Sequence, residues 1–311
     1  KRGAKRRNPD RHFGGDVKKL SFLTAPLIFG EECAKIGSMN DCLREERGAQ
    51  MIYTWDTAVR WNDTDADLHV RPSQLLVYMQ EAACRHMHDA GQDLDDLRFA
   101  RGLAFIVTRL TLRFHSHLHP LENIRVQTWI DEARGVNFPR YFRVLGESGA
   151  TVAEGASDWA LMDLSTHMPV RADAFSYNTE PSPALSLRPP RRFAPAEPMC
   201  EVGRRRIAYS DIDYNGHMNN TRYPDMVCDF LPDGTVAWVR QMSFEFVREA
   251  ACGTTLRVLR GERLTPAGER AYLLRTEDGE GRTCLQAEVT LAPGETDAPA
   301  EADAPGEVRH E

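Results

Sequence analysis

The chain has 311 residues, 41% of them hydrophobic, and a formal net charge of −7 at neutral pH. That length and composition suit one large domain or two of about 100–150 residues each. The negative charge argues against general nucleic-acid binding, and no apolar run reaches the ~18 residues that a membrane-spanning helix needs. The seven cysteines form no Cys-x-x-Cys pair, which is typical of a reducing compartment, so we expect a cytoplasmic protein.

Residues 1–50 differ in character from the rest of the chain. They begin with a basic segment and continue with an apolar run at 20–29 that a proline interrupts. This order superficially resembles a secretory signal, but acidic residues lie within the basic part and directly after the apolar run. We therefore expect a disordered N-terminal extension, or a segment upstream of a natural start at Met39 or Met51.

The region 51–171 reads as a first folded domain. A strand at 55–61 and a polar turn at 62–70 precede a helix that begins at Pro72-Ser73, carries apolar residues at helical spacing and stops at Gly91. Alternating or apolar runs then predict strands at 103–107, 110–114, 124–130, 139–145 and 151–164. The proline-rich stretch 172–203 that follows is predicted to be a linker.

The region 204–291 repeats this order of elements. We expect a strand at 207–209, a polar motif at 209–223, and a helix from about 220 to 231. Strands are predicted near 236–246, 255–260, 271–275 and 284–291. The tail from Ala292 to Glu311 is rich in alanine, proline and acidic residues, and we expect it to be disordered.

The polar motif of the second half is the strongest functional signal. It places four chemically useful side chains at intervals of two: Asp211, Asp213, Asn215 and His217. If the backbone is extended, this spacing brings them to one face, where they can position water, move protons and polarise a carbonyl. Helix-capping residues at 219–221 would add backbone N–H groups. An ordinary loop is the plainer interpretation, whereas a calcium loop is excluded because Arg222 stands where such a loop needs a bidentate glutamate.

An internal duplication explains why the motif has this spacing. Asp63, Asp65, Asp67 and His69 align with the four motif residues at one constant offset. A second block, 110–126, aligns with 242–258 at another constant offset, and the order of the blocks is the same. The copies differ at positions that could take part in catalysis, because the first copy has Asp67 where the second has Asn215, and His117 where the second has Glu249. One working site and one structural copy is the economical interpretation.

The duplicated unit resembles the hotdog fold, in which an antiparallel sheet wraps a long central helix. The pattern Asp213-x-Asn215-x-His217-x-Asn219-Asn220, followed by Phe244-Glu-Phe-x-Arg-Glu249, resembles the acyl-acyl-carrier-protein thioesterases. The resemblance covers about residues 53–291 and implies an α+β chain of two tandem hotdog domains. It also implies a catalytic set in the second domain: Asp213, Asn215, His217 and Glu249. Plant members often place a cysteine after the glutamate, but Ala250 stands there, so a cysteine nucleophile is excluded.

The resemblance implies hydrolysis of a fatty acyl thioester on acyl carrier protein, ending chain elongation without a metal or cofactor. Glu249 and Asp213 would activate water, or one of them would attack the carbonyl directly. The residues expected to bind substrate are Asn219, Asn220, Leu75, Leu76, Met79, Ala83 and Phe105, with Met87, Leu103 and Val107 as further candidates for lining the acyl slot. An ordinary core is the alternative interpretation for each apolar one.

The expected partner is acyl carrier protein, whose acidic surface would favour a basic patch such as the arginines at 188–192 and 204–206. A solvated linker explains these arginines equally well. We expect no metal at His115, His117 and His119, because no carboxylate or cysteine joins them at ligand spacing. A monomer and a homodimer both stay open. The alternative functions are an acyl-CoA thioesterase, a non-catalytic acyl-binding hotdog protein and, less favoured, a hotdog dehydratase.

Overall fold

The computed structural model describes residues 52–178, 180–182 and 184–292, all of which belong to one structural unit. The predictions for residues 1–50 and 293–311 lie outside this described part. Within it, no helix is both long enough and apolar enough to cross a bilayer.

The first copy wraps five strands and a short sixth one around a helix. The helix α2 (Pro72–Asp89) begins at the predicted proline and ends just before Gly91, whose positive φ of 71° stops it. The strands are β1 (Tyr53–Ala58), β2 (Leu103–Phe114), β3 (Asn123–Ile130), β4 (Phe138–Leu145), β5 (Thr151–Asp163) and β6 (Met168–Val170). The two strands predicted at 103–107 and 110–114 are a single strand, β2, because a bulge between Val107 and Arg109 bends it without ending it.

The second copy has five strands and a much shorter helix. Its strands are β7 (Cys200–Arg206), β8 (Val239–Phe246), β9 (Thr255–Leu264), β10 (Arg270–Glu277) and β11 (Thr283–Leu291). The predicted strand at 207–209 is wrong, because the chain turns into a 3-10 helix at Tyr209–Asp211. The predicted helix is a 3-10 turn at Asn220–Arg222 followed by α3 (Tyr223–Cys228), which ends early as its last bonds tighten to the 3-10 pattern.

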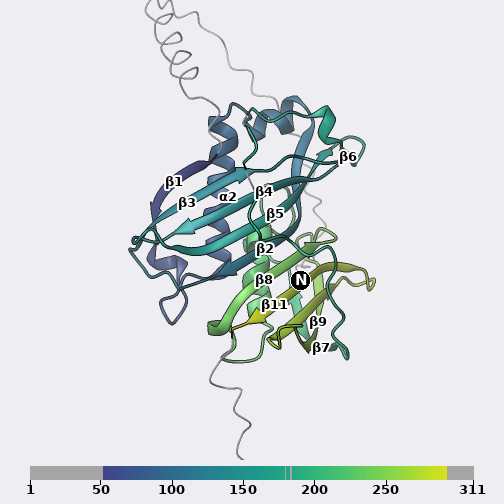
Figure 1. The fold of residues 1–311 in the computed structure, drawn as a ribbon. Helices are drawn as coiled ribbons and strands as arrows, with labels where there is room; N and C mark the ends of the chain where they lie inside the picture. The colour runs from purple at the N-terminus through teal and green to yellow at the C-terminus, as the bar shows by residue number, and fades with distance from the viewer. Residues whose placement is uncertain (1–51, 179, 183, 293–311) are drawn as a thin grey trace, which may run out of the picture. The chain divides into compact units, whose positions relative to one another are not determined.

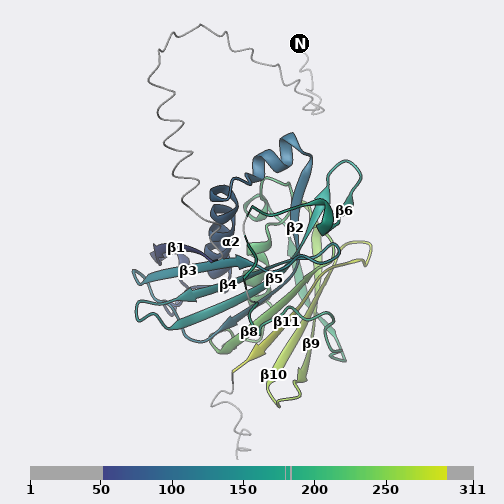
Figure 2. The ribbon, with the colours of Figure 1, turned by 45° about the horizontal axis from the view of Figure 1, so that its top comes forward.

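All strands join in one antiparallel sheet of the order β1-β3-β4-β5-β2-β8-β11-β10-β9-β7, with β6 paired to β5. Figures 1 and 2 show the two halves meeting where β2 lies beside β8. The first five strands in this order correspond one to one, in reverse, with the last five. The strand order thus supports the internal duplication independently of the sequence offsets.

The helix α2 packs closely against the sheet of its own copy. Leu75, Leu76 and Met79 are buried in the main core, which extends without a break into the second copy. A Cβ atom at Gly155 on β5 would lie 2.9 Å from the Met79 sulfur, so a larger residue there would force the Met79 side chain or the helix to shift.

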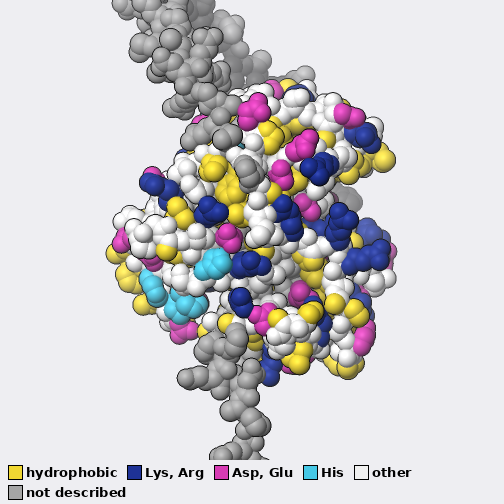
Figure 3. Space-filling view, viewed as in Figure 1, with side chains coloured by type: hydrophobic (Ala, Val, Ile, Leu, Met, Phe, Trp, Pro, Cys, Tyr) yellow, Lys and Arg dark blue, Asp and Glu magenta, His cyan; other side chains and the backbone are white. Residues whose placement is uncertain are grey.

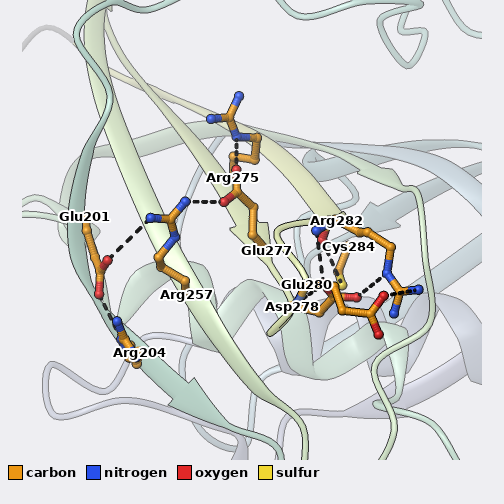
Figure 4. A network of polar contacts seen from close by, with 9 residues as sticks. All are labelled: Glu201, Arg204, Arg257, Arg275, Glu277, Asp278, Glu280, Arg282 and Cys284. Atoms are coloured by element: carbon orange, nitrogen blue, oxygen red, sulfur yellow. Dashed lines mark hydrogen bonds and ion pairs between the residues drawn. The ribbon is translucent and has the colours of Figure 1, made fainter.

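Ion pairs hold the strands of the second copy at their surface (Figure 4). Glu277 on β10 pairs with Arg257 on β9 and, at 3.0 Å, with Arg275 on its own strand. Arg282 pairs with Asp278 and Glu280, each at 2.8 Å, and closes the turn between β10 and β11. Pairs whose arginines remain open to water contribute little stability each, typically below about 1 kcal/mol, but this turn fixes Arg282 beside the cavity described next.

Candidate active site

The polar motif forms a tight turn rather than an extended segment. The Oδ1 atom of Asp213 accepts a hydrogen bond from the Asn215 backbone N–H at 2.8 Å, and the Gly216 N–H donates to the Asp213 carbonyl at 3.0 Å. Gly216 has a φ of 85°, a conformation that favours glycine. The prediction that an extended backbone brings four side chains to one face is therefore wrong in its geometry.

Asp211 points away from the other motif residues. It is only 4% exposed and accepts hydrogen bonds at 2.8 Å from both Arg205 Nη2 and the Ala208 backbone N–H. Asp63, its counterpart in the first copy, is equally buried and accepts a bond from Arg60 Nε at 2.8 Å. The first aspartate of each motif therefore anchors its own loop and does not belong to the site.

A short antiparallel bridge brings the glutamate to the histidine. The Met218 N–H donates to the Ala250 carbonyl at 2.9 Å, and His217 pairs with Ala251 in an isolated β-bridge. As a result, His217 Nε2 lies 3.1 Å from Glu249 Oε2. The side chains are 36% and 57% exposed, so water can reach both of them.

One cavity of about 770 Å³ connects the motif with the first copy. All four residues of the expected catalytic set, Asp213, Asn215, His217 and Glu249, line it. Its remaining wall comes mainly from α2, the segment 94–98 and β2, and it includes most of the apolar residues expected to hold an acyl chain: Ala83, Met87, Leu103, Phe105 and Val107. Leu75, Leu76 and Met79 are placed elsewhere, in the buried core and not in the cavity lining.

Asn219 and Asn220 also line the cavity, but Asn219 has a structural task as well. Its Oδ1 accepts hydrogen bonds at 2.9 Å from the backbone N–H and from the hydroxyl of Thr221. It thus caps the 3-10 turn that precedes α3. The Thr221 N–H, one of the backbone groups that the sequence predicted for the site, is already occupied by this cap.

Sequence reasoning missed Arg98, which reaches the motif from the other copy. Arg98 lies in a short π-helix at Asp96–Ala100, and its Nη1 donates to Asn215 Oδ1 at 2.5 Å. Its guanidinium also lies 5.4 Å from the Tyr214 ring centre. Because the carbonyl end of the Asn215 amide faces Arg98, the NH2 end is the one left to donate to a ligand. The contact joins positions 117 residues apart, so no local sequence pattern predicts it.

The first copy keeps the same turn without the same chemistry. Asp65 Oδ1 accepts bonds from the backbone N–H groups of Asp67 and His69 at 2.9 and 3.0 Å. At the place of the histidine–glutamate contact, the rings of His69 and His117 stack with centroids 3.8 Å apart, and His119 meets His69 edge-on at 5.3 Å. Burial, reinforced by these neighbouring imidazoles, lowers the pKa of His117. No group of three metal-ligating side chains suited to a metal ion occurs among the described residues.

Comparison with known proteins bears directly on this geometry. The sequence model for the acyl-ACP thioesterase N-terminal domain matches residues 50–174, and that for the acyl-ACP thioesterase C-terminal domain matches residues 200–291. The chain is 23% identical to a chloroplastic palmitoyl-acyl carrier protein thioesterase of Arabidopsis thaliana over 261 residues, and 22% identical to one of Cuphea hookeriana over 259. These alignments cover 75% of this chain and 63% and 62% of those proteins, so the chain spans less than two thirds of their length.

Solved structures share the fold. An acyl-ACP thioesterase from Bacteroides thetaiotaomicron superposes with a TM-score of 0.68 at 21% identity, covering 80% of this chain and 99% of that one. The 12:0-ACP thioesterase from Umbellularia californica gives a TM-score of 0.61 at 19% identity, covering 79% and 98%. These likenesses confirm the expected tandem hotdog fold. The two family matches show that the chain belongs to the acyl-ACP thioesterase family.

Proposed function

We propose that this chain hydrolyses the thioester of a fatty acyl group carried by acyl carrier protein. Water adds to the thioester carbonyl, the carbon–sulfur bond breaks, and the products are a free fatty acid and the carrier thiol. The observation that carries the proposal is the 3.1 Å contact of His217 Nε2 with Glu249 Oε2 in the wall of a largely apolar cavity. Asp213 and Asn215 line the same cavity and complete a set suited to this chemistry.

Each polar group has a role that its contacts support. Glu249 accepts the proton of the attacking water, since it is the carboxylate of the set that touches an imidazole, and His217 orients it. Asn215 donates its amide N–H to the thioester oxygen, because Arg98 already holds the other end of that amide. Asp213 keeps the turn closed through Oδ1 and helps to position the water.

The two copies divide the work in this proposal. The second domain, residues 204–291, supplies the reacting groups, and the first domain, residues 51–171, supplies the slot for the acyl chain. The support is the cavity itself, because its apolar wall comes mainly from α2, the segment 94–98 and β2, while its carboxylates come from the motif and from Glu249. Burying the chain along this wall provides binding free energy at about 25 cal/mol per Å² of apolar surface.

Basic residues near the motif suit an acidic carrier that bears a phosphopantetheine arm. Arg98, Arg248 and Arg282 line the cavity together with the reacting groups. In the arginine-rich region considered from the sequence, Arg204 and Arg205 already pair with acidic residues of this chain. Figure 3 shows basic and acidic side chains interspersed over the visible face, with no single basic patch among the described residues that would mark a docking surface there. We therefore propose that the carrier docks at the cavity mouth, beside the three arginines of the lining.

The proposal also includes a reducing compartment and a monomeric state. The five free cysteines among the described residues support a reducing compartment, as in the cytoplasm. Pairing of β2 with β8 already joins two hotdog units within one chain, which supports a monomer over a homodimer. Light scattering of the purified protein decides between these two states.

The experiment is a thiol-release assay with matched acyl chains on acyl carrier protein and on coenzyme A. The proposal expects hydrolysis of both carriers' thioesters, with the higher kcat/KM on acyl carrier protein. A preference for coenzyme A would make the chain an acyl-CoA thioesterase. Acyl binding without thiol release on either carrier would contradict the proposal and leave a non-catalytic acyl-binding protein.

A further inference from the structure

A buried arginine lines the same cavity at a distance from the reacting groups. Arg140 lies on β4, is 5% exposed and is part of the cavity wall. The sheet order β8-β2-β5-β4 places β4 two strands beyond β2, about 10 Å at the usual strand spacing. The motif residues belong to the second copy, on the other side of β2. Arg140 therefore lies at the opposite end of the cavity from His217 and Glu249.

The guanidinium of Arg140 has neutral hydrogen-bond partners. Its Nη1 donates to His86 Nδ1 at 3.1 Å and to Thr128 Oγ1 at 3.2 Å. Burial, together with the nearby positive charge of Arg140, lowers the pKa of His86 to about 3, so His86 is neutral at physiological pH. No hydrogen bond from Nε or Nη2 to another described residue accompanies these two, and no described carboxylate forms an ion pair with the group.

The other titratable groups near Arg140 carry no negative charge either. Burial raises the pKa of the Tyr177 hydroxyl to about 12 and raises the pKa of the Cys84 thiol as well. Both side chains line the cavity. Burial also lowers the pKa of Arg140, yet a guanidinium keeps its proton in proteins because its ordinary pKa lies above 12. A cation thus lies among neutral side chains.

Burying an unpaired cation costs free energy, and binding an anion beside it offsets much of that cost. Buried charges in proteins are normally paired, because removing an ion from water carries a large desolvation penalty. A guanidinium binds a carboxylate through two parallel N–H···O bonds, and its Nε and Nη2 groups offer one such edge. The apolar wall between the motif and Arg140, with Ala83, Phe105 and Trp159, suits a chain of methylene groups.

We propose that the cavity selects acyl chains that carry a carboxylate at their far end, with Arg140 as the residue that binds it. This inference rests on the proposed thioesterase function and names its substrate class. The thioester would lie at His217 and Glu249, the methylene chain would cross β2 and β5, and the terminal carboxylate would reach Arg140. The product is then a dicarboxylic acid. Arg140 determines specificity and takes no part in the cleavage.

The experiment compares two series of acyl thioesters on the same carrier. Chains of equal carbon number end either in a methyl group or in a carboxylate, and thiol release gives kcat/KM for each. At the length that spans the cavity, we expect the carboxylate-ended chain to be preferred by at least about tenfold, the size of a charge-assisted hydrogen-bonded pair. Shorter carboxylate-ended chains should be poor substrates, because their charge would stop against the apolar wall.

Two variants and one binding measurement secure the assignment. Arg140→Met should remove the preference by lowering kcat/KM for the carboxylate-ended chain about 10- to 100-fold while sparing methyl-ended chains. Arg143→Met is the matched control, because Arg143 lies on the same strand but outside the cavity lining, over Trp129. If Arg140→Met does not fold, the unmodified protein still decides: a dicarboxylic acid should raise its melting temperature more than the monocarboxylic acid of equal length.

The outcomes separate this inference from the function on which it rests. Cleavage that favours methyl-ended chains at every length, with no effect of Arg140→Met on that preference, would overturn the inference and leave the thioesterase function in place. Absence of thiol release from both series would overturn the proposed function and the inference together. A carboxylate preference lost in Arg140→Met and kept in Arg143→Met supports both.

Discussion

The Oγ1 atom of Thr111 and the Oγ atom of Ser243 lie 2.9 Å apart, and the two residues hold the same position in the two copies. They face each other in the pairing of β2 with β8, and both are buried. The axis that relates the copies therefore passes between them. The two motifs stand on opposite sides of this axis. The motif of the second copy faces the long helix α2 of the first copy, and the motif of the first copy faces the short helix α3 of the second. Only the motif of the second copy has a glutamate, Glu249, beside its histidine.

The symmetry supplies a matched control for the proposed catalytic pair. Glu249→Gln and His217→Gln should each lower kcat by about 100- to 10,000-fold with little change in KM, because the first removes the group that accepts the proton of water and the second removes the group that orients it. The counterparts His117→Gln and His69→Gln should leave kcat within about twofold, since neither residue lines the cavity. Steady-state thiol release measures all four variants. Equal losses in both copies would contradict the assignment of chemistry to the second one.

The two aspartates of the motif should respond in opposite ways to the same substitution. Asp211→Asn should lower the free energy of unfolding by about 1–3 kcal/mol, because it weakens buried bonds to Arg205 and to a backbone N–H, while kcat of the folded protein stays near normal. Asp213→Asn should lower kcat and change stability less. Urea denaturation and thiol release, measured on both variants, separate the effects. A strong loss of kcat in folded Asp211→Asn protein would place that residue in the site.

Arg98 is a positioning residue whose effect should appear in kcat. Arg98→Met frees the Asn215 amide to rotate, and we expect kcat to fall about tenfold, the size of one lost oriented hydrogen bond. Arg98→Lys keeps a donor and should recover part of the loss. Arg101→Met serves as the control, because Arg101 lies just after the same π-helix but stacks over Phe175. A change confined to KM would mean that Arg98 binds substrate and does not orient Asn215.

Stability should depend on pH through His86. Its pKa is about 3 in the folded protein, against a reference value of 6.5, because burial and Arg140 disfavour its charged form. Below pH 6.5 the unfolded chain binds a proton that the folded protein refuses, so this contribution to stability is complete above pH 6.5 and is lost as the pH falls toward 3. The slope is about 1.4 kcal/mol per pH unit. Denaturation curves between pH 6.5 and about 4.5 measure it before carboxylates titrate.

His86→Gln isolates this effect, because glutamine can accept the Arg140 hydrogen bond and does not titrate. The variant should show a flatter loss of stability over the same pH range. The pKa of His117 is also lowered, so the variant retains a second contribution of the same sign. An identical pH dependence in the wild type and in His86→Gln would contradict the assignment to His86.

A single-turnover reaction in oxygen-18-labelled water distinguishes whether Glu249 acts as the general base or as the nucleophile. With Glu249 as the general base, one heavy oxygen atom enters the fatty acid in every turnover, and none enters the protein. With Glu249 as the nucleophile, an acyl–enzyme anhydride forms, and label appears in the glutamate whenever water attacks on its side. Mass spectrometry of the acid and of the peptide that contains Glu249 gives the answer. We expect label in the acid alone.

The sequence is informative where local pattern and repetition set the structure. The start of α2 at Pro72, most of the strands and the alignment of Thr111 with Ser243 follow from periodicity and from the constant offset. The alternation of Asp211 and Asp213 misleads, because period two brings side chains together only on an extended backbone, and this backbone turns. The dipeptide Asn215-Gly216 is the sequence signal for that turn, and the positive φ at Gly216 agrees with it.

Long-range contacts are the part that the sequence does not predict. Arg98 meets Asn215 across 117 positions, and the encounter depends on how the two copies pack against each other. Arg140 lies on a strand whose burial alternates poorly, with consecutive buried residues at 140–142, so its side-chain direction is not readable from spacing. Both arginines appear in the sequence as ordinary surface cations, and only the tertiary structure turns them toward the cavity.

The central claim is that His217 and Glu249 in the second copy cleave an acyl thioester on acyl carrier protein. The most direct test is thiol release from acyl carrier protein thioesters by the wild type, by Glu249→Gln and by the symmetry control His117→Gln. The account predicts turnover by the wild type and by His117→Gln, and a loss of at least about 100-fold in Glu249→Gln. Near-normal turnover by folded Glu249→Gln protein would contradict it.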